Sequence, residues 1–340
     1  MTQTKKTLSW TLLSKYRAPL MGIAMIGVYL THYKQAFSVN KVTPVPWIVR
    51  QLKYGSSGVD IFLILSGLGL CYSFAKDSNL LRFYGKRLVR LLPAYVITQA
   101  VYYLLLLVQN GHVNNAQFFR KMFFVNYFTK GSAGFWFIIA ILICYLIFPL
   151  IYKIMGMTRH RLLNLVIGMA LYAVLHMLLW RYDRTLYLNT IGLVQRIPAF
   201  IMGVWIGREC LDDREFHVIL IPLCWLLTAV VLLRDRIPFF PKPGFPLYEF
   251  SLTLVGMSLI FFFVLLFEGM KDAGWMNRCL RFLSFLGGIT LECYLMHSLM
   301  KWVFFSPVQP LAYFVTCCVL PTAAAWALHK ICGRLTGRTV

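Results

Sequence analysis

One histidine lies inside an apolar stretch of the chain. The segment YRAPLMGIAMIGVYLTHYKQ contains Arg17 at its start and His32 fifteen residues later, about 22 Å apart along a helix. A histidine within a membrane span is costly to bury, and its ordinary pKa near neutrality suits proton abstraction. His32 is therefore a candidate general base. The alternatives are a histidine hydrogen-bonded to a neighbouring helix and one at the membrane interface.

A single acid follows in GVDIFLILSG, residues 58–67. A buried carboxylate needs a partner, so Asp60 is predicted either to orient His32 or to hold a basic loop. Capping the start of a helix would use the same residue equally well. Gly58 and Gly67 permit close approach of another backbone.

The densest positive charge is in RFYGKRLVRLLP, residues 82–93. Arg87 and Arg90 are three residues apart and share one helical face, with Lys86 beside them. Paired arginines make forked contacts with phosphate oxygens, which predicts an anionic ligand. The alternative is anchoring at the cytoplasmic face of a membrane.

Two further segments contain polar groups at membrane depth. Arg196 lies in QRIPAFIMGVWIG, and Glu292 and His297 lie in ITLECYLMHSLMKW. An intramembrane arginine faces a cavity, a carboxylate or the interface. We expect Glu292 to pair with Arg196, His297 to lie near the outer end, and Arg196 to stabilise an oxyanion or join a structural polar network.

The remaining histidines and the nine cysteines predict no further chemistry. No cysteine or histidine cluster has metal-ligand spacing, so neither a metal site nor a disulfide framework is expected. The other histidines are interpreted as loop or interface residues: His112, His160, His176, His217 and His329.

The elements that position these groups follow from composition. Of 340 residues, 59% are hydrophobic and 14% are charged, which excludes an ordinary soluble enzyme. The net charge of +22 would suggest nucleic acid in a soluble protein, but here the basic residues separate long apolar runs, so no nucleic-acid partner is expected. The prediction is an all-α polytopic membrane protein whose ten spans are 18–36, 56–75, 91–109, 133–152, 162–180, 187–207, 216–233, 247–267, 282–300 and 308–329. The distribution of basic residues favours both termini in the cytoplasm.

Five motifs in order make the chain resemble the membrane-bound acyltransferase-3 family, which includes O-acetyltransferases of bacterial surface polysaccharides. They are GVDIFLILSG with FYGKRLVRLLPAY, then FWFIIAILICYLIFP, RIPAFIMGVWIG and ITLECYLMH. The resemblance implies a ten-helix bundle in the bacterial cytoplasmic membrane. It also implies a cytoplasmic acyl-CoA donor, acetyl-CoA by default, and a carbohydrate acceptor on the far side or linked to a lipid. That acceptor would be capsule, exopolysaccharide, O-antigen or wall glycan.

The chain departs from the family at one position. Relatives carry an arginine eleven residues before the histidine, where this chain has Met21. Arg17 lies one helical turn earlier on a similar face, which suggests that it replaces the missing arginine. We expect a single membrane domain over 1–340, with a cytoplasmic segment 1–16, a tail 330–340 and no appended soluble domain.

These expectations combine into one mechanism. Lys86, Arg87, Arg90 and Arg17 would bind acyl-CoA, and His32, supported by Asp60, would activate an acceptor hydroxyl. The alternative class is a proton-coupled transporter or flippase that uses the same buried polar groups as a path. Transporters often contain inverted repeats, and none is evident here.

Overall fold

The computed structural model describes residues 7–39, 52–131, 134–233, 246–303, 312 and 314–337. Within these ranges the chain is all-α apart from one short ribbon, in which β1 (Thr7–Ser9) pairs antiparallel with β2 (Glu215–His217). The all-α prediction is confirmed. The ends of the predicted segments 1–16 and 330–340, and parts of the predicted spans 133–152 and 308–329, lie outside the described residues.

The helices follow one another through short connections. The first half contains α1 (Thr11–Lys15), α2 (Arg17–Val39), the 3₁₀ turn η1 (Leu52–Ser57), α4 (Gly58–Lys76), α5 (Leu80–Asn110), α6 (Asn115–Met122), α7 (Val125–Lys130), α8 (Trp136–Ile154) and α9 (Arg161–Tyr182). The second half contains α10 (Arg184–Val194), α11 (Ile197–Leu211), α12 (Leu220–Leu232), α13 (Pro246–Gly269), α14 (Gly274–Gly288), α15 (Thr290–Val303), the π-turn η3 (Val315–Val319) and α17 (Leu320–Leu335).

The predicted count of ten spans is not confirmed. Among the described residues, five helices are long and apolar enough to cross a membrane: Tyr54–Lys76, Leu80–Asn110, Trp136–Ile154, Arg161–Tyr182 and Val315–Leu335. The number rises to seven if each of two bent helix pairs forms one span, and α12 and Thr253–Gly269 are apolar but shorter. The chain is thus a multi-pass membrane protein, while the sidedness of its termini stays a prediction.

The two bends coincide with the predicted polar positions. The α10–α11 pair bends by 41° at Arg196, just before Pro198 in the first turn of α11. The α14–α15 pair bends by 68° at Ile289, between Gly288 and the polar segment of α15. Because proline cannot donate to the preceding turn, the sequence RIPA favours a break where the structure has one.

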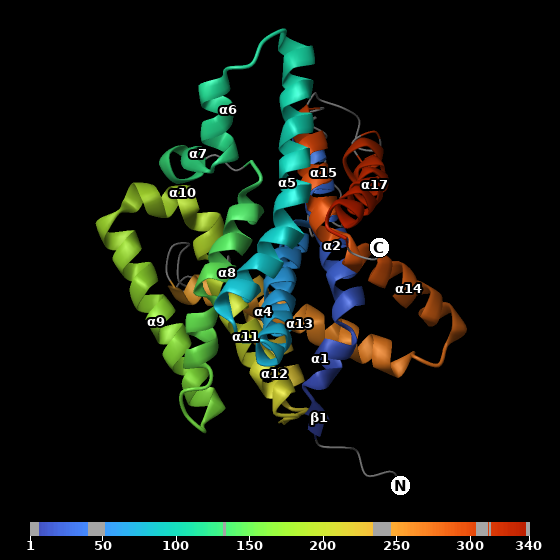
Figure 1. Ribbon diagram of the computed structural model, residues 1–340. Helices are drawn as coiled ribbons and strands as arrows, with labels where there is room; N and C mark the ends of the chain where they lie inside the picture. Colours follow the sequence, from blue (N-terminus) through green and yellow to red (C-terminus); the bar gives the residue numbers. More distant parts are fainter. Residues whose placement is uncertain are drawn as a thin grey trace.

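Glycines bring the central helices close together. A Cβ on Gly67 of α4 would lie 2.8 Å from the Phe200 carbonyl oxygen of α11, and one on Gly58 would clash with the backbone of Ala24 in α2. The expectation of close backbone approach at Gly58 and Gly67 is therefore confirmed. In Figure 1, α2 and α15 lie near the middle, α9 on the left flank and α14 on the right.

Candidate active site

A cavity of about 580 Å³ opens among α2, α4, α5 and α8 and the α14–α15 bend, within the size range of ligand pockets. Each helix presents one face to it, at helical spacing: Arg17, Ala18 and Met21 from α2, Phe62 and Ser66 from α4, Lys86, Arg87, Arg90 and Leu91 from α5, Phe137, Ile141 and Tyr145 from α8, and Gly287, Gly288, Thr290, Leu291 and Tyr294 around α14 and α15. The set Phe137, Ile141 and Tyr145 was not predicted, although its four-residue spacing marks a single helix face.

All four basic residues predicted to bind the donor line this one cavity. Arg17 Nε donates to the Leu65 carbonyl at 2.8 Å, and Arg90 donates to the Gly288 carbonyl at 3.0 Å. The Arg87 guanidinium lies over the Phe83 ring, 5.2 Å from its centre. None of the described lining residues is acidic, so the cavity favours an anionic ligand.

Lys86 is held at the edge of the cavity by an acid beyond the end of α4. Its ammonium donates to Asp77 at 3.2 Å, and Arg82 lies 3.5 Å from the same carboxylate. The pKa of Asp77 lies below its usual range, first because the Asn79 backbone N–H donates to the carboxylate and then because Lys86 does. Lys86 is therefore partly neutralised before any ligand arrives.

A second polar centre contains His32. Its ring lies 4.7 Å from that of His297, centre to centre, and its Nδ1 lies 3.1 Å from the Lys301 ammonium. Tyr29 lies on the same helix as His32, and the centre of its ring is 5.1 Å from the centre of the His297 ring. Sequence reasoning named both histidines but not their proximity, and it missed Tyr29 and Lys301.

Hydrogen bonds fix the proton positions on the two rings. An ammonium only donates, so His32 Nδ1 is the acceptor in its hydrogen bond with Lys301. A carbonyl only accepts, so His297 Nδ1 donates to the Cys317 carbonyl. His297 is 1% exposed, and its Nε2 has no hydrogen-bond partner among the residues described. The His32 Nδ1 lone pair is thus engaged by Lys301, whereas His297 Nε2 accepts no hydrogen bond from the described residues.

Two helices connect the cavity with the histidine centre. Along α2, Met21 lines the cavity and His32 follows eleven residues later, about 16 Å further along the axis. Along α15, Tyr294 lines the cavity and His297 follows within one turn. The basic residues line the cavity, and the two histidines lie beyond its aromatic residues Phe137 and Tyr294. The Phe137 N–H donates to Tyr294 Oη at 3.1 Å.

Asp60 forms a buried ion pair with Arg196, which joins α4 to the start of α11. Asp60 is fully buried and Arg196 is 7% exposed. The predicted pairing of Arg196 with Glu292 is wrong, because another carboxylate occupies the guanidinium. Neither member of the pair lines the cavity. The predicted support of His32 by Asp60, and an oxyanion role for Arg196, stay predictions.

Glu292 instead contacts a histidine of α17 and an arginine that lines the cavity. Its carboxylate is 2.8 Å from His329 Nδ1 and 3.8 Å from the Arg90 guanidinium. His329 is therefore not a simple interface residue. The same correction applies to His176, which is buried in α9 and bonded to the Tyr172 hydroxyl at 2.8 Å. The contacts of Glu292 join segments far apart in sequence, so local spacing gave no signal for them. Tyr172 and His176, by contrast, lie one turn apart on α9.

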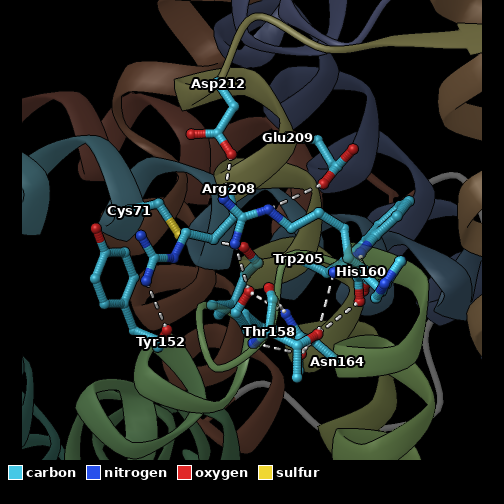
Figure 2. A network of polar contacts seen from close by, with 12 residues as sticks. Cys71, Tyr152, Thr158, His160, Asn164, Trp205, Arg208, Glu209 and Asp212 are labelled. Carbon is cyan, nitrogen blue, oxygen red and sulfur yellow. Dashed lines mark hydrogen bonds and ion pairs between the residues drawn. The ribbon is translucent and has the colours of Figure 1, made fainter.

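A separate polar network, shown in Figure 2, holds the turn between α8 and α9 against α11. Asn164 bonds the Met155 and Thr158 carbonyls at 3.0 Å, and Arg208 donates to the Tyr152 carbonyl at 3.2 Å. Arg161 forms ion pairs with Asp212 and Glu209. None of these residues lines the cavity, so the network is structural.

The part of the chain that the structure describes contains no group of three or more histidine, cysteine, aspartate or glutamate residues that could hold a metal ion. Comparison with known families places residues 20–330 in the acyltransferase domain of the acyltransferase-3 family, so the chain belongs to that family. The match begins three residues after Arg17. Searches of curated proteins and of solved structures found no match. The chain is thus a membrane acyltransferase by family, as its motifs predicted.

Proposed function

We propose that the protein transfers an acyl group, acetyl by family default, from cytoplasmic acyl-CoA to a hydroxyl of an extracytoplasmic or lipid-linked carbohydrate. One observation carries this proposal: the four basic residues converge on a cavity whose helices lead to a histidine pair. The corresponding location is a bacterial cytoplasmic membrane, with the basic end of the cavity facing the cytoplasm.

The donor would bind by its charges at the entrance. Arg87 and Arg90 offer forked donors to phosphate oxygens, Lys86 adds a point charge, and Arg17 lines the same cavity. Arg17 and Met21 both line it, which supports Arg17 as the replacement for the missing family arginine. The aromatic walls would then surround the narrow arm that bears the thioester, pointing it toward His32.

The transfer would use His32 as general base. The acceptor hydroxyl would displace Lys301 from Nδ1 and give its proton to that nitrogen as its oxygen attacks the thioester carbon. The new C–O bond forms, the C–S bond breaks, and the leaving sulfur takes the proton back from the imidazolium. His297, whose buried Nε2 has no partner within the described part of the chain, is the second candidate for this base.

The test is acyl-CoA binding and acyl transfer by the purified protein in lipid nanodiscs. We expect saturable acyl-CoA binding and transfer to surface glycan or lipid-linked saccharide from the host. His32→Ala should bind the donor normally and lose transfer, while Arg87→Ala with Arg90→Ala should weaken donor binding. A transporter would show solute flux without acyl-CoA binding, and that result would refute the proposal.

A further inference from the structure

The basic cavity has two chemically different ends. Helix α8 lies along it, and Tyr145, Ile141 and Phe137 line it at four-residue intervals. The charges of Arg87 and Arg90 act on the Tyr145 hydroxyl, which places Tyr145 at the basic end. Phe137 is eight residues away, about 12 Å along the helix axis. A ligand that binds the arginines by its anionic part and continues into the cavity therefore meets Phe137.

Three aromatic side chains form a wall at the Phe137 end. The Phe137 ring lies 6.1 Å from that of Phe62 in α4 and 5.3 Å from that of Tyr294 in α15, centre to centre. All three residues line the cavity, and each comes from a different helix. The Phe137 N–H donates to Tyr294 Oη at 3.1 Å, which ties α8 to α15 at this point. Because packed rings leave little free space between them, this aromatic wall limits how far a ligand can extend.

The aromatic wall is also uncharged. Its one polar side-chain group is the Tyr294 hydroxyl. The four cations among the described lining residues lie on α2 and α5, and three of them, Arg17, Arg87 and Arg90, act on Tyr145 at the other end. A carboxylate placed at the wall would lose its hydration without gaining an ionic partner, which is costly. The wall thus suits a small group without charge.

We infer that the aromatic wall of Phe62, Phe137 and Tyr294 holds the acyl group of the donor and restricts it to short, uncharged acyl groups. This inference rests on the proposed function and deepens it, because it derives the class of acyl group from the shape and charge of the cavity. Acetyl satisfies both limits, whereas hexanoyl exceeds the length and succinyl adds a carboxylate. His297 follows Tyr294 within one turn of α15, so an acyl group at the wall lies on the histidine side of the cavity.

The length limit predicts a reversal of the ordinary hydrophobic trend. In an apolar pocket with free space, each added methylene of the acyl chain tightens binding about fourfold. The test measures Kd for CoA, acetyl-CoA, butyryl-CoA and hexanoyl-CoA with the purified protein in nanodiscs. We expect hexanoyl-CoA to bind at least fivefold more weakly than acetyl-CoA. Equal or tighter binding of hexanoyl-CoA would overturn the inference.

Truncating the wall identifies it as the cause of the limit. Phe137→Ala opens space at this end, so the ratio of hexanoyl-CoA to acetyl-CoA affinity should rise at least tenfold while Kd for CoA stays within twofold. Phe262→Ala is the matched control, because Phe262 is an exposed ring on α13 that does not line the cavity. It should leave the ratio unchanged. A ratio that Phe137→Ala also leaves unchanged would refute the role of the wall.

A second variant tests the same end in the opposite direction and does not depend on the folding of Phe137→Ala. Leu291 is a half-buried residue that lines the cavity one turn before Tyr294. Leu291→Phe adds a ring beside the wall and should weaken acetyl-CoA binding at least fivefold while sparing CoA. Unaltered affinity for acetyl-CoA in this variant would count against an acyl site at the wall.

The charge limit is tested by two acyl groups of equal length. Butyryl and succinyl both have four carbons, but succinyl ends in a carboxylate. We expect succinyl-CoA to bind at least tenfold more weakly than butyryl-CoA, both in the unmodified protein and in Phe137→Ala, because added space supplies no cation. Equal affinity for the two donors would refute the exclusion of charged acyl groups.

Binding of CoA separates this inference from the proposed function, because CoA has the phosphates but no acyl group. If the protein binds CoA and every acyl-CoA alike, the aromatic wall selects nothing, and the acyltransferase proposal stands. If neither CoA nor any acyl-CoA binds, the proposed function itself fails.

Discussion

Removing Arg87 and Arg90 should weaken acyl-CoA binding by a predictable amount. Both line the basic end of the cavity, and neither is fully buried. A hydrogen bond to a charged group contributes about 1.5–3 kcal/mol, and partial exposure favours the lower end of this range. At about 1.4 kcal/mol per tenfold change in affinity, each alanine substitution should raise Kd roughly tenfold, and the double substitution roughly 100-fold.

The assay is isothermal titration of acetyl-CoA into protein in nanodiscs, at low and high salt. Arg82→Ala is the matched control, because Arg82 is an exposed cation on the same helix that does not line the cavity. Its Kd should stay within twofold of the unmodified protein. The salt dependence of Kd should flatten in the double variant, because fewer charges then meet the donor.

Replacing Arg87 by lysine separates charge from geometry. A lysine keeps the charge but loses the planar fork, so Arg87→Lys should recover only part of the affinity that Arg87→Ala loses. If the Kd of the double alanine variant changes by less than twofold, the reasoning is refuted. Arg87 and Arg90 would then serve only to anchor the helix at the cytoplasmic face of the membrane.

Three further predictions test the supporting contacts. Arg196→Leu removes the ion-pair partner of the buried Asp60 carboxylate and should lower the free energy of unfolding by about 3–5 kcal/mol, whereas Arg196→Leu with Asp60→Leu should recover most of the lost Tm; equal losses would contradict the pairing. Glu292→Gln removes a charge 3.8 Å from Arg90 and should tighten acyl-CoA binding roughly two- to fivefold at low salt; weaker binding would contradict this. The pKa of Asp77 is lowered, so its ion pairs contribute fully to folding stability above the ordinary pKa of 3.8 and lose this contribution only as the pH falls through the lowered pKa. In a titration of Tm against pH, Asp77→Asn should abolish this step.

The sequence predicted those features that depend on one helix at a time. Arg87 and Arg90 share a face at three-residue spacing, and both reach the cavity for that reason. Arg17 and Met21, one turn apart, do so as well. The break at Arg196, inside the predicted span 187–207, has a local signal in the nearby Pro198, although no break was predicted.

The sequence did not predict which helices face each other. Glu292 was expected beside Arg196 but bonds His329, and the His297 ring proved to lie against His32. In helices that are apolar on nearly every face, side-chain pattern does not fix rotation about the axis, so polar partners on different helices cannot be assigned. Lys301 was overlooked for the same reason, because only the packed bundle brings it to His32.

The central claim is that His32 acts on a thioester donor bound in the basic cavity. The most direct test is single-turnover transfer from radiolabelled acetyl-CoA to lipid-linked saccharide, comparing the unmodified protein with His32→Ala at matched donor occupancy. Loss of a general base typically lowers the rate by about 10²–10⁴-fold, so we expect that loss with an unchanged Kd for acetyl-CoA. A His32→Ala protein that transfers acetyl groups at the unmodified rate would contradict the account.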